Sequence, residues 1–433
     1  MSSNTTIKSK IMLIDENKHM KDYSLTKRLL SAITAATLAF LFGLSLTNSA
    51  GFYSVCKALS ASKDLKLCDD LSFTNKNEGF FKLGLPLKEA QIGLASALVA
   101  IGALCSSNGI AYINRSLKTK MYISSFLYLI GNACITGIGN VFMVYSGKYI
   151  IGLGAGITCS VVPLYLSLIA PKESKILFNG LMPIGIVSGI FCGQVSSYFF
   201  RSLDSWRNCF FITFFLLIFN LISLAFIQNI KLESNNSDRI GILELLRSKK
   251  ARRSLVVSIM VHLAQQFSGI NGVLIFCETI FKNQKNPGLC TIIALFISLI
   301  TTIISIFISN RFGRKPLLSL SCFLCSVGLF GLMTNFYPIH SMLLYMIGFN
   351  FGLRSIPWAI TSEIFPPDYV VAAIQISICA NWQANAFVTV MFPIILKIYK
   401  ELSFCFFFGF MIFSSIFFLT FFKETKGSEP ALQ

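Results

Sequence analysis

Twelve long blocks of mostly apolar residues constrain this 433-residue chain more than any other feature. An α-helix needs about 20 residues to cross the hydrocarbon core of a bilayer. Because that core offers the backbone no water, each block must pair its N–H and C=O groups internally as a helix. Only 13% of the residues are charged, whereas about a quarter are charged in soluble proteins. The sequence therefore predicts an all-α membrane protein with twelve transmembrane helices, at residues 29–52, 88–111, 121–139, 142–168, 178–200, 207–229, 254–281, 289–309, 316–335, 341–364, 371–396 and 402–422.

Basic residues gather on one side of these predicted helices. Lys27 and Arg28 precede the first block, Arg252 and Arg253 precede the seventh, and the loops after the third and ninth blocks contain no Lys or Arg. Loops rich in Lys and Arg stay in the cytoplasm. We therefore expect both termini to be cytoplasmic in a multi-pass protein of the plasma membrane. The net charge of +18 follows from this topology and from attraction to anionic lipid, not from nucleic-acid binding.

Polar sequences at the helix ends recur in the second half of the chain. Asn114-Arg115 follows the second block as Asn310-Arg311 follows the eighth, and Pro163 in the fourth block corresponds to Pro357 in the tenth. Such internal repeats are typical of secondary transporters. The sequence predicts a cytoplasmic tail, a six-helix half, a cytoplasmic linker, a second six-helix half and a second cytoplasmic tail, at residues 1–28, 29–229, 230–253, 254–422 and 423–433.

Six short motifs stand at or near the ends of the predicted helices. They are Gly152-Leu153-Gly154-Ala155-Gly156 with Val162-Pro163-Leu164-Tyr165, Gln265-Gln266-Phe267-Ser268-Gly269-Ile270-Asn271, Arg311-Phe312-Gly313-Arg314-Lys315, Pro357-Trp358 through Glu363-Ile364-Phe365-Pro366, Asn381-Trp382, and Glu424-Thr425-Lys426-Gly427. Together, and in this order, they resemble the sugar-porter branch of the major facilitator superfamily, and facilitative glucose transporters in particular. The resemblance implies the major facilitator fold and transport of a small neutral sugar by alternating access. It implies no cofactor and no metal, and a monomer or weak oligomer in membrane lipid.

Five amide side chains and one tryptophan are the predicted substrate-binding residues. Amides donate and accept hydrogen bonds without carrying charge, as recognition of a neutral polyol requires, and an indole offers an aromatic face to a sugar. On an unbroken helix Gln266 and Asn271 would point about 140° apart, so both face one cavity only if the helix unwinds at Ser268-Gly269. The alternative is that the amides only join helices to one another. The predicted set is Gln265, Gln266, Asn271, Trp358, Asn381 and Asn385.

Charged residues follow the eighth block and end the tenth. The resemblance implies that Arg311, Arg314 and Glu363 form a clasp that holds the cytoplasmic side closed while the outer side is open. The alternative is that they are ordinary flanking charge, which accounts for the arginines but not for a lone Glu363 beside Pro366.

Glu278 and Arg354 lie inside predicted helices, where charge is costly and usually functional. Glu278 lies seven residues beyond Asn271, on almost the same helical face, and Arg354 lies one turn before Trp358. We predict that Glu278 and Arg354 form an intramembrane ion pair. The alternative is that Arg354 bonds carbonyls freed by a bend at Pro357. An unpaired Arg354 facing the cavity would instead favour an anionic substrate such as a sugar phosphate.

The first block carries no titratable group at the position where proton-driven relatives have an aspartate. Here Phe42-Gly43 is followed by Leu44-Ser45. The expected function is therefore uniport of a hexose such as glucose. The alternatives are a proton-coupled sugar or polyol symporter and a transporter of an anionic sugar derivative selected by Arg354. A non-transporting sugar sensor is less expected, because sensors append long tails and only 28 residues precede the first block. No nucleophile constellation, phosphate loop or metal cluster suggests an enzyme.

Cys56 and Cys68 lie together in the predicted first outer loop. That side of the membrane permits a disulfide. Because the chain has 13 cysteines, an odd number, free thiols are the open alternative.

Overall fold

The computed structural model describes residues 24–61, 89–110, 113, 115–137, 140–171, 174–202, 205–230, 240–281, 283–426 and 432. These residues form helices and no strand. The helices of the N-terminal half are α2 (Leu25–Thr47), α3 (Ala50–Ala61), α5 (Glu89–Gly109), α6 (Leu117–Thr136), α7 (Val141–Ile169), α8 (Lys175–Phe199), α9 (Asn208–Ser223) and the 3₁₀ helix η3 (Leu224–Phe226). After α10 (Ile242–Arg247) follow α11 (Arg252–Gln266), α12 (Ile270–Ile280), α13 (Pro287–Arg311), α14 (Arg314–Met333), α15 (Pro338–Phe351), α16 (Ile356–Ile364), α17 (Pro367–Tyr399), η5 (Lys400–Phe404) and α18 (Cys405–Phe421).

Short polar side chains set where several helices begin. The Ser24 hydroxyl accepts a bond from the Lys27 N–H at 3.4 Å, and Ser116 caps α6 through the Thr119 N–H at 3.2 Å. Asn286 caps α13 in the same way and is followed by Pro287 in the first turn. Because the first N–H groups of a helix lack partners within it, a capping oxygen stabilises the start.

The twelve predicted spans all appear as helices; the first, 29–52, runs from α2 into α3 across a short turn, and two others are broken near their middle. Among the described residues, nine helices are long and apolar enough to cross a membrane. A tenth, α6, has 20 residues but a more polar sequence. The remaining predicted spans, 254–281 and 341–364, are the broken pairs α11–α12 and α15–α16. The predicted all-α, twelve-span class is confirmed.

Both broken spans are explained by local sequence. Between α11 and α12, Gly269 has a φ of +84°, a conformation that glycine adopts without steric cost. Between α15 and α16, the chain leaves the helix after Phe351 and resumes at Ile356. Pro357 therefore lies in the first turn of α16, where its missing N–H would have had no partner. The interruption thus precedes Pro357 rather than bending around it.

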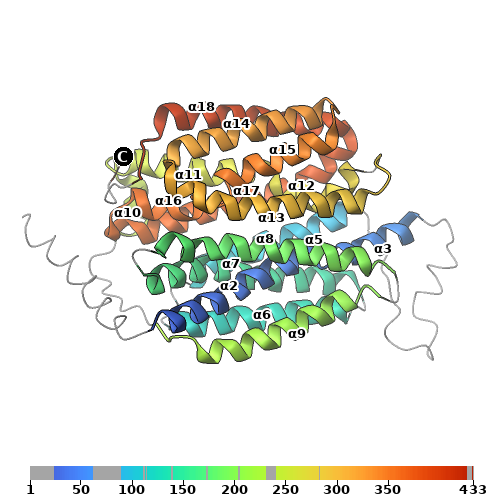
Figure 1. The fold of residues 1–433 in the computed structure, drawn as a ribbon, viewed down its shortest axis with the longest axis horizontal. Coiled ribbons are helices and arrows are strands. Elements are labelled where there is room, and N and C mark those ends of the chain that lie inside the picture. Colours follow the sequence, from blue (N-terminus) through green and yellow to red (C-terminus); the bar gives the residue numbers. More distant parts are fainter. Residues whose placement is uncertain are drawn as a thin grey trace, which may run out of the picture.

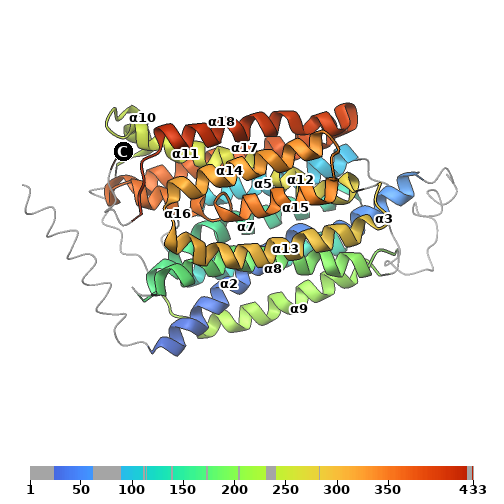
Figure 2. The same ribbon diagram turned by 45° about the horizontal axis from the view of Figure 1, so that its top comes forward.

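The helices form two bundles, one from each half of the chain, that lie side by side (Figure 1). They remain separate when the molecule is turned (Figure 2), with α8 next to α13. Each bundle has a buried apolar core, and Ile378 and Trp382 of α17 pack into that of the N-terminal bundle. Helix α2 begins and α18 ends at one end of the molecule, which we call the terminal end (Figure 1). The opposite end, where α12 turns into α13, is the distal end (Figure 1).

The N-terminal bundle is held together by close contact between α2 and α8. A Cβ atom at Gly43 would overlap the carbonyl oxygen of Ile186, and one at Gly189 would overlap that of Phe40. Helices in lipid gain no hydrophobic driving force against one another, so backbones that approach closely at small residues provide the packing energy.

We predict that Gly43→Val lowers the melting temperature of the detergent-purified protein, because the two helices must separate to admit the side chain. Overpacking of this kind costs about 1–3 kcal/mol. The matched control is Gly409→Val in α18, where an added Cβ meets open space. Equal melting temperatures for the two variants would contradict the assigned α2–α8 contact.

Candidate functional site

A cavity of about 1020 Å³ lies between the two halves. Residues of α2, α5, α7 and α8 line it from one half, and residues of α11 to α13, α16 and α17 line it from the other. It extends from Glu278 near the distal end to Glu363 near the terminal end. Small-molecule pockets usually measure about 300–1,000 Å³, so the cavity has room for a ligand with water around it.

Four of the predicted amides form one chain of hydrogen bonds along the wall of this cavity. Asn271 Nδ2 donates to Gln266 Oε1 at 2.6 Å, and Gln266 Nε2 donates to Asn381 Oδ1 at 2.9 Å. Asn381 Nδ2 donates to Gln265 Oε1 at 2.8 Å, and Gln265 Nε2 donates to the Leu353 carbonyl at 2.8 Å. The break at Gly269 therefore does bring Gln266 and Asn271 together. Each amide fixes the orientation of the next.

Of the five predicted amides, Asn271 and Asn385 leave a polar atom free to face a ligand, whereas Gln265, Gln266 and Asn381 bond through both of their polar atoms. Asn381 is fully buried and both of its polar atoms are bonded, so its direct role is to join α17 to α11. Gln265 likewise bonds through both ends. By contrast, Asn271 Oδ1 has no bonding partner among the described residues, and Asn385 Nδ2 has none there either, since Asn385 only accepts from Thr389 at 3.1 Å.

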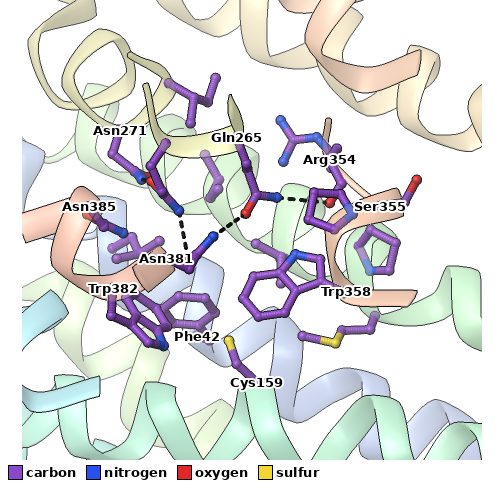
Figure 3. Close-up of a pocket in the computed structure, with 18 of the residues that line it drawn as sticks. Phe42, Cys159, Gln265, Asn271, Arg354, Ser355, Trp358, Asn381, Trp382 and Asn385 are labelled. Carbon is purple, nitrogen blue, oxygen red and sulfur yellow. Dashed lines mark hydrogen bonds between the residues drawn. The ribbon is translucent and has the colours of Figure 1, made fainter. Parts of the chain in front are cut away.

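Aromatic rings complete the central part of the cavity. Trp358 packs edge-to-face on His262, with ring centroids 5.8 Å apart. Trp382 is buried, and its indole N–H has no partner within the described part of the chain. Figure 3 shows the two tryptophans beneath the amide chain, with Phe42 and Cys159 facing them from the N-terminal half. An aromatic face and an open N–H beside amides suit a ring that has both C–H and O–H sides.

The predicted ion pair between Glu278 and Arg354 is wrong in this structure. Glu278 Oε1 instead accepts from Arg201 Nη2 at 2.6 Å and from Gln194 Nε2 at 2.9 Å, both in or just after α8. This geometry places an ion pair across the two halves at the distal end. This pair was not predictable from the sequence, because Arg201 directly follows its apolar block and looks like flanking charge.

Arg354 is held by neutral groups in its own half. Its Nε donates to Asn350 Oδ1, and its Nη2 lies 3.4 Å from Ser298 Oγ. The guanidinium also stands 5.0 Å from the centre of the Phe349 ring. The predicted alternative, in which the arginine side chain bonds carbonyls freed at the break, is not seen either; Gln265 bonds those carbonyls.

At the terminal end, Arg314 and Glu363 form the ion pair expected of the clasp. Arg314 Nη2 lies 2.9 Å from Glu363 Oε1, and the Thr425 hydroxyl donates to Glu363 Oε2 at 2.8 Å. Arg311 does not take part among the described residues: its side chain is exposed, and its carbonyl accepts from Lys426. All of these residues belong to the C-terminal half, so the pair joins α14 to α16 rather than one half to the other.

Glu424 caps the start of α14 beside this pair. Its carboxylate accepts from the backbone N–H groups of Arg314 at 2.8 Å and Lys315 at 3.0 Å. Gly313 makes this possible, because a Cβ there would overlap the carboxylate. Burial raises the pKa of Glu424, but bonds from the N–H groups of Lys426, Arg314, Lys315 and Thr425 lower it more, so the pKa lies below its ordinary value.

Sequence reasoning missed several polar residues that line the cavity, among them Lys148, Gln194 and His262. Lys148 was detectable, since it is a basic residue inside the fourth apolar block. Gln194 and His262 also stand inside predicted spans, but neither belongs to a recognisable pattern. Of the predicted disulfide, Cys56 is buried in α3 and Cys68 lies outside the described residues, so that pairing stays a prediction.

Comparison with known proteins identifies extensive similarity. The family model for "Sugar (and other) transporter" matches residues 31–229 and 226–430. Facilitated glucose transporter member 3 of solute carrier family 2 is a curated relative. The mouse protein is 28% identical over 394 residues, which are 77% of this chain and 79% of the relative. The human protein is 27% identical over 474 residues, covering 94% and 92%.

Solved structures share the fold. The proton:xylose symporter XylE bound to 6-bromo-6-deoxy-D-glucose has a TM-score of 0.73 at 20% identity, with 94% of this chain and 98% of that chain covered. The partially occluded inward-open form of the Escherichia coli xylose transporter has a TM-score of 0.72 at 21% identity, covering 93% and 99%.

We predict that acidification destabilises the protein through Glu424. Because its folded pKa is depressed, the stability it contributes is complete above the ordinary glutamate pKa of about 4.3 and is lost as the pH falls through the lower folded pKa. Melting temperatures in detergent between about pH 6 and pH 3 should therefore fall more for the wild type than for Glu424→Gln. Glu244→Gln, at an exposed glutamate of α10, is the control and should follow the wild type. Parallel curves for all three proteins would contradict the assigned cap.

Proposed function

This chain belongs to the sugar transporter family of the major facilitator superfamily, and from that premise we propose that it carries a hexose such as glucose down its concentration gradient by alternating access. The family consists of transporters rather than enzymes, and the chain is a multi-pass integral membrane protein. We further propose that it acts in the plasma membrane, mainly as a monomer, with both termini in the cytoplasm. The clustered basic residues of the terminal end support that orientation.

The observation that carries the proposal is the group of amides in the C-terminal half, with two free polar atoms beside two tryptophans. Asn271 and Asn385 each offer one unbonded amide atom to the cavity, and Trp382 offers an indole N–H. We propose that these groups, with Trp358, contact the sugar directly. Gln265, Gln266 and Asn381, each bonded at both ends, act by positioning them.

Such a site binds weakly, which suits transport. Each hydrogen bond contributes about 0.5–1.5 kcal/mol net, and the amides are already oriented by one another, so little ordering is needed when the sugar enters. Because the groups are neutral, they would release a neutral sugar to either side without moving charge.

The distribution of carboxylates supports uniport over proton symport. Among the described residues, only Glu278 and Glu363 line the cavity as acids, and each lies in an ion pair with an arginine. No unpaired acid is therefore left among the described cavity residues to carry a proton.

The ion pair at the distal end supports the gating step. Arg201 and Gln194 bond Glu278 across the halves, and Asn286 donates to the Tyr198 hydroxyl at 2.9 Å beside them. In the described residues the terminal end has no ion pair between the halves. We propose that this conformation is closed at the distal, outer end. In the opposite conformation Arg314 and Glu363 would serve as the clasp.

We predict that proteoliposomes containing the protein take up labelled glucose to equilibrium, and that an imposed pH gradient changes neither rate nor extent. Trp358→Ala and Asn385→Ala should each lower the initial rate by about tenfold, as loss of about 1.4 kcal/mol of binding would do. Gln383→Ala is the control, since Gln383 lies on the same helix as Asn385 but is exposed and bonds only Cys379.

Either of two results would contradict the function as proposed. Accumulation of glucose above equilibrium that collapses with the pH gradient would indicate symport. Uptake equally affected by Gln383→Ala and Asn385→Ala would place the sugar elsewhere.

We predict that Arg201→Gln opens the distal end. Cys277 is buried, lines the cavity and adjoins Glu278, so its labelling by a membrane-impermeant maleimide reports access from that side. Loss of about 1 kcal/mol from the closed state should raise the labelling rate about fivefold, as read by peptide mass spectrometry. Arg253→Gln, which removes a terminal-end bond to the Phe421 carbonyl, should leave the rate unchanged. An unchanged labelling rate in Arg201→Gln would show that the ion pair between Arg201 and Glu278 does not hold the distal end closed.

A further inference from the structure

Lys148 is a buried cation that transport of a neutral sugar does not use. It lies two turns from the start of α7, is only 2% exposed and lines the cavity from the N-terminal half. Its Nζ donates to Ser49 Oγ at 2.6 Å and lies 3.4 Å from the Ser45 carbonyl oxygen. Charged side chains at this depth in a membrane are costly and usually mark a functional pathway.

None of the groups around Lys148 neutralises it. Its oxygen partners are a hydroxyl and a carbonyl, and the ring of Tyr53 stands 5.7 Å away. Within the described ranges, no carboxylate lies at ion-pair distance from Lys148; the two that line the cavity pair with Arg201 and Arg314.

Tyr53 adds a second donor at the same place. Its hydroxyl is buried and makes no hydrogen bond of normal geometry with the described residues, although the Ser96 and Ser49 side chains lie near it. Both Tyr53 and Lys148 line the cavity. An ammonium group and a phenolic O–H are donors of the kind that bind carboxylate or phosphate oxygens through charge-assisted bonds.

The cavity as a whole has an excess of positive charge. After the two ion pairs are set aside, the described lining retains three cations and no acid: Lys120, Lys148 and Arg354. Arg354 is held by neutral oxygens in the opposite half. A cleft with low-dielectric walls concentrates such a field and attracts anions into it.

We infer that Lys148 and Tyr53 form an oxyanion subsite that faces the amide cluster across the cavity. The inference rests on the proposed sugar site and adds a negative charge to what that site binds. The oxyanion is either a phosphate or carboxylate group on the sugar itself, or a free inorganic phosphate that binds together with the sugar. Asn271, Asn385 and the tryptophans contact the sugar ring, and the N-terminal half contacts the anion. The positive charge of Arg354 adds to the attraction of the anion into the cavity, but we do not assign Arg354 a direct contact with the anion.

The test is equilibrium binding to the purified full-length protein at constant ionic strength. Labelled glucose is displaced by unlabelled glucose, glucose 6-phosphate or glucuronate, and is also bound with and without inorganic phosphate. The variants are Lys148→Met, Lys148→Arg and Tyr53→Phe. Lys120→Met removes a cavity cation that bonds only the Ile110 carbonyl and serves as the matched control. Melting temperatures verify folding, and Lys148→Met should be at least as stable as the wild type because it removes a buried charge.

A sugar-borne anion predicts that glucose 6-phosphate or glucuronate binds about tenfold more tightly than glucose, a difference of about 1.4 kcal/mol. Lys148→Met should abolish this preference, Tyr53→Phe should reduce it, and Lys148→Arg and Lys120→Met should keep it. A free anion predicts instead that inorganic phosphate tightens the binding of glucose, with the same pattern across the variants.

Two results would overturn the oxyanion subsite and leave the proposed sugar transport standing. Glucose binding that is indifferent to every anion excludes the subsite, and an anion effect that survives Lys148→Met or disappears equally in Lys120→Met places the anion elsewhere. If neither neutral nor anionic sugars bind the folded protein, the proposed function fails and the subsite fails with it.

Discussion

The bond from Gln265 to the Leu353 carbonyl is the interaction on which the centre of this molecule depends. Two transmembrane segments are broken at mid-depth, and each break frees backbone groups that lipid cannot satisfy. Gln265 ends α11 beside the first break and donates across to the second, at 2.8 Å. Its other end accepts from Asn381, which ties α17 to both. The amides thus stabilise the broken helices and, by the same bonds, hold Gln266 and Asn271 at the cavity. The structural and ligand-binding interpretations of these residues are therefore complementary.

Charge is arranged at the two ends of the bundle in different ways. At the distal end, Arg201 and Glu278 come from different halves, so any rocking of the halves that opens this end must separate them. At the terminal end, Arg314, Glu363 and Glu424 all belong to one half, so they stay together during such a motion. The terminal cluster stabilises the start of α14 and keeps a charged surface ready for contact with the other half. This difference is what the proposed alternating-access cycle would require if, as we propose, this conformation is closed at the distal end.

Much of this architecture followed from the sequence, because membrane helices are encoded by local composition. The twelve spans were predicted from the lengths of the apolar blocks, and the family from the order of six motifs. The unwinding at Gly269 was predicted from the glycine between Gln266 and Asn271. The partners of charged residues were not, because pairing depends on how helices meet in space. Glu278 faces α8 rather than α16, and the pattern of apolar residues along α12 does not predict which neighbouring helix Glu278 faces. Arg311 and Arg314 differ for a similar reason: the start of α14 directs only the second toward Glu363. The division of the chain into two halves and a linker at 230–253, and the binding roles of the amides, remain predictions.

The contrast between the two walls of the cavity bears on what the site recognises. The C-terminal wall presents amides and indoles, which are neutral and suit hydroxyl groups. The N-terminal wall presents Lys148 beside the buried Tyr53 hydroxyl, in a cavity whose carboxylates are already paired with arginines. A neutral sugar would satisfy the first wall and leave the Lys148 cation of the second with only a hydroxyl, a carbonyl and an aromatic ring as described neighbours, and no negative charge. A ligand with a polyol body and an oxyanion, in one molecule or two, would satisfy both. Since the halves must move relative to each other during transport, a ligand that bonds both walls would also couple its own binding to their closure.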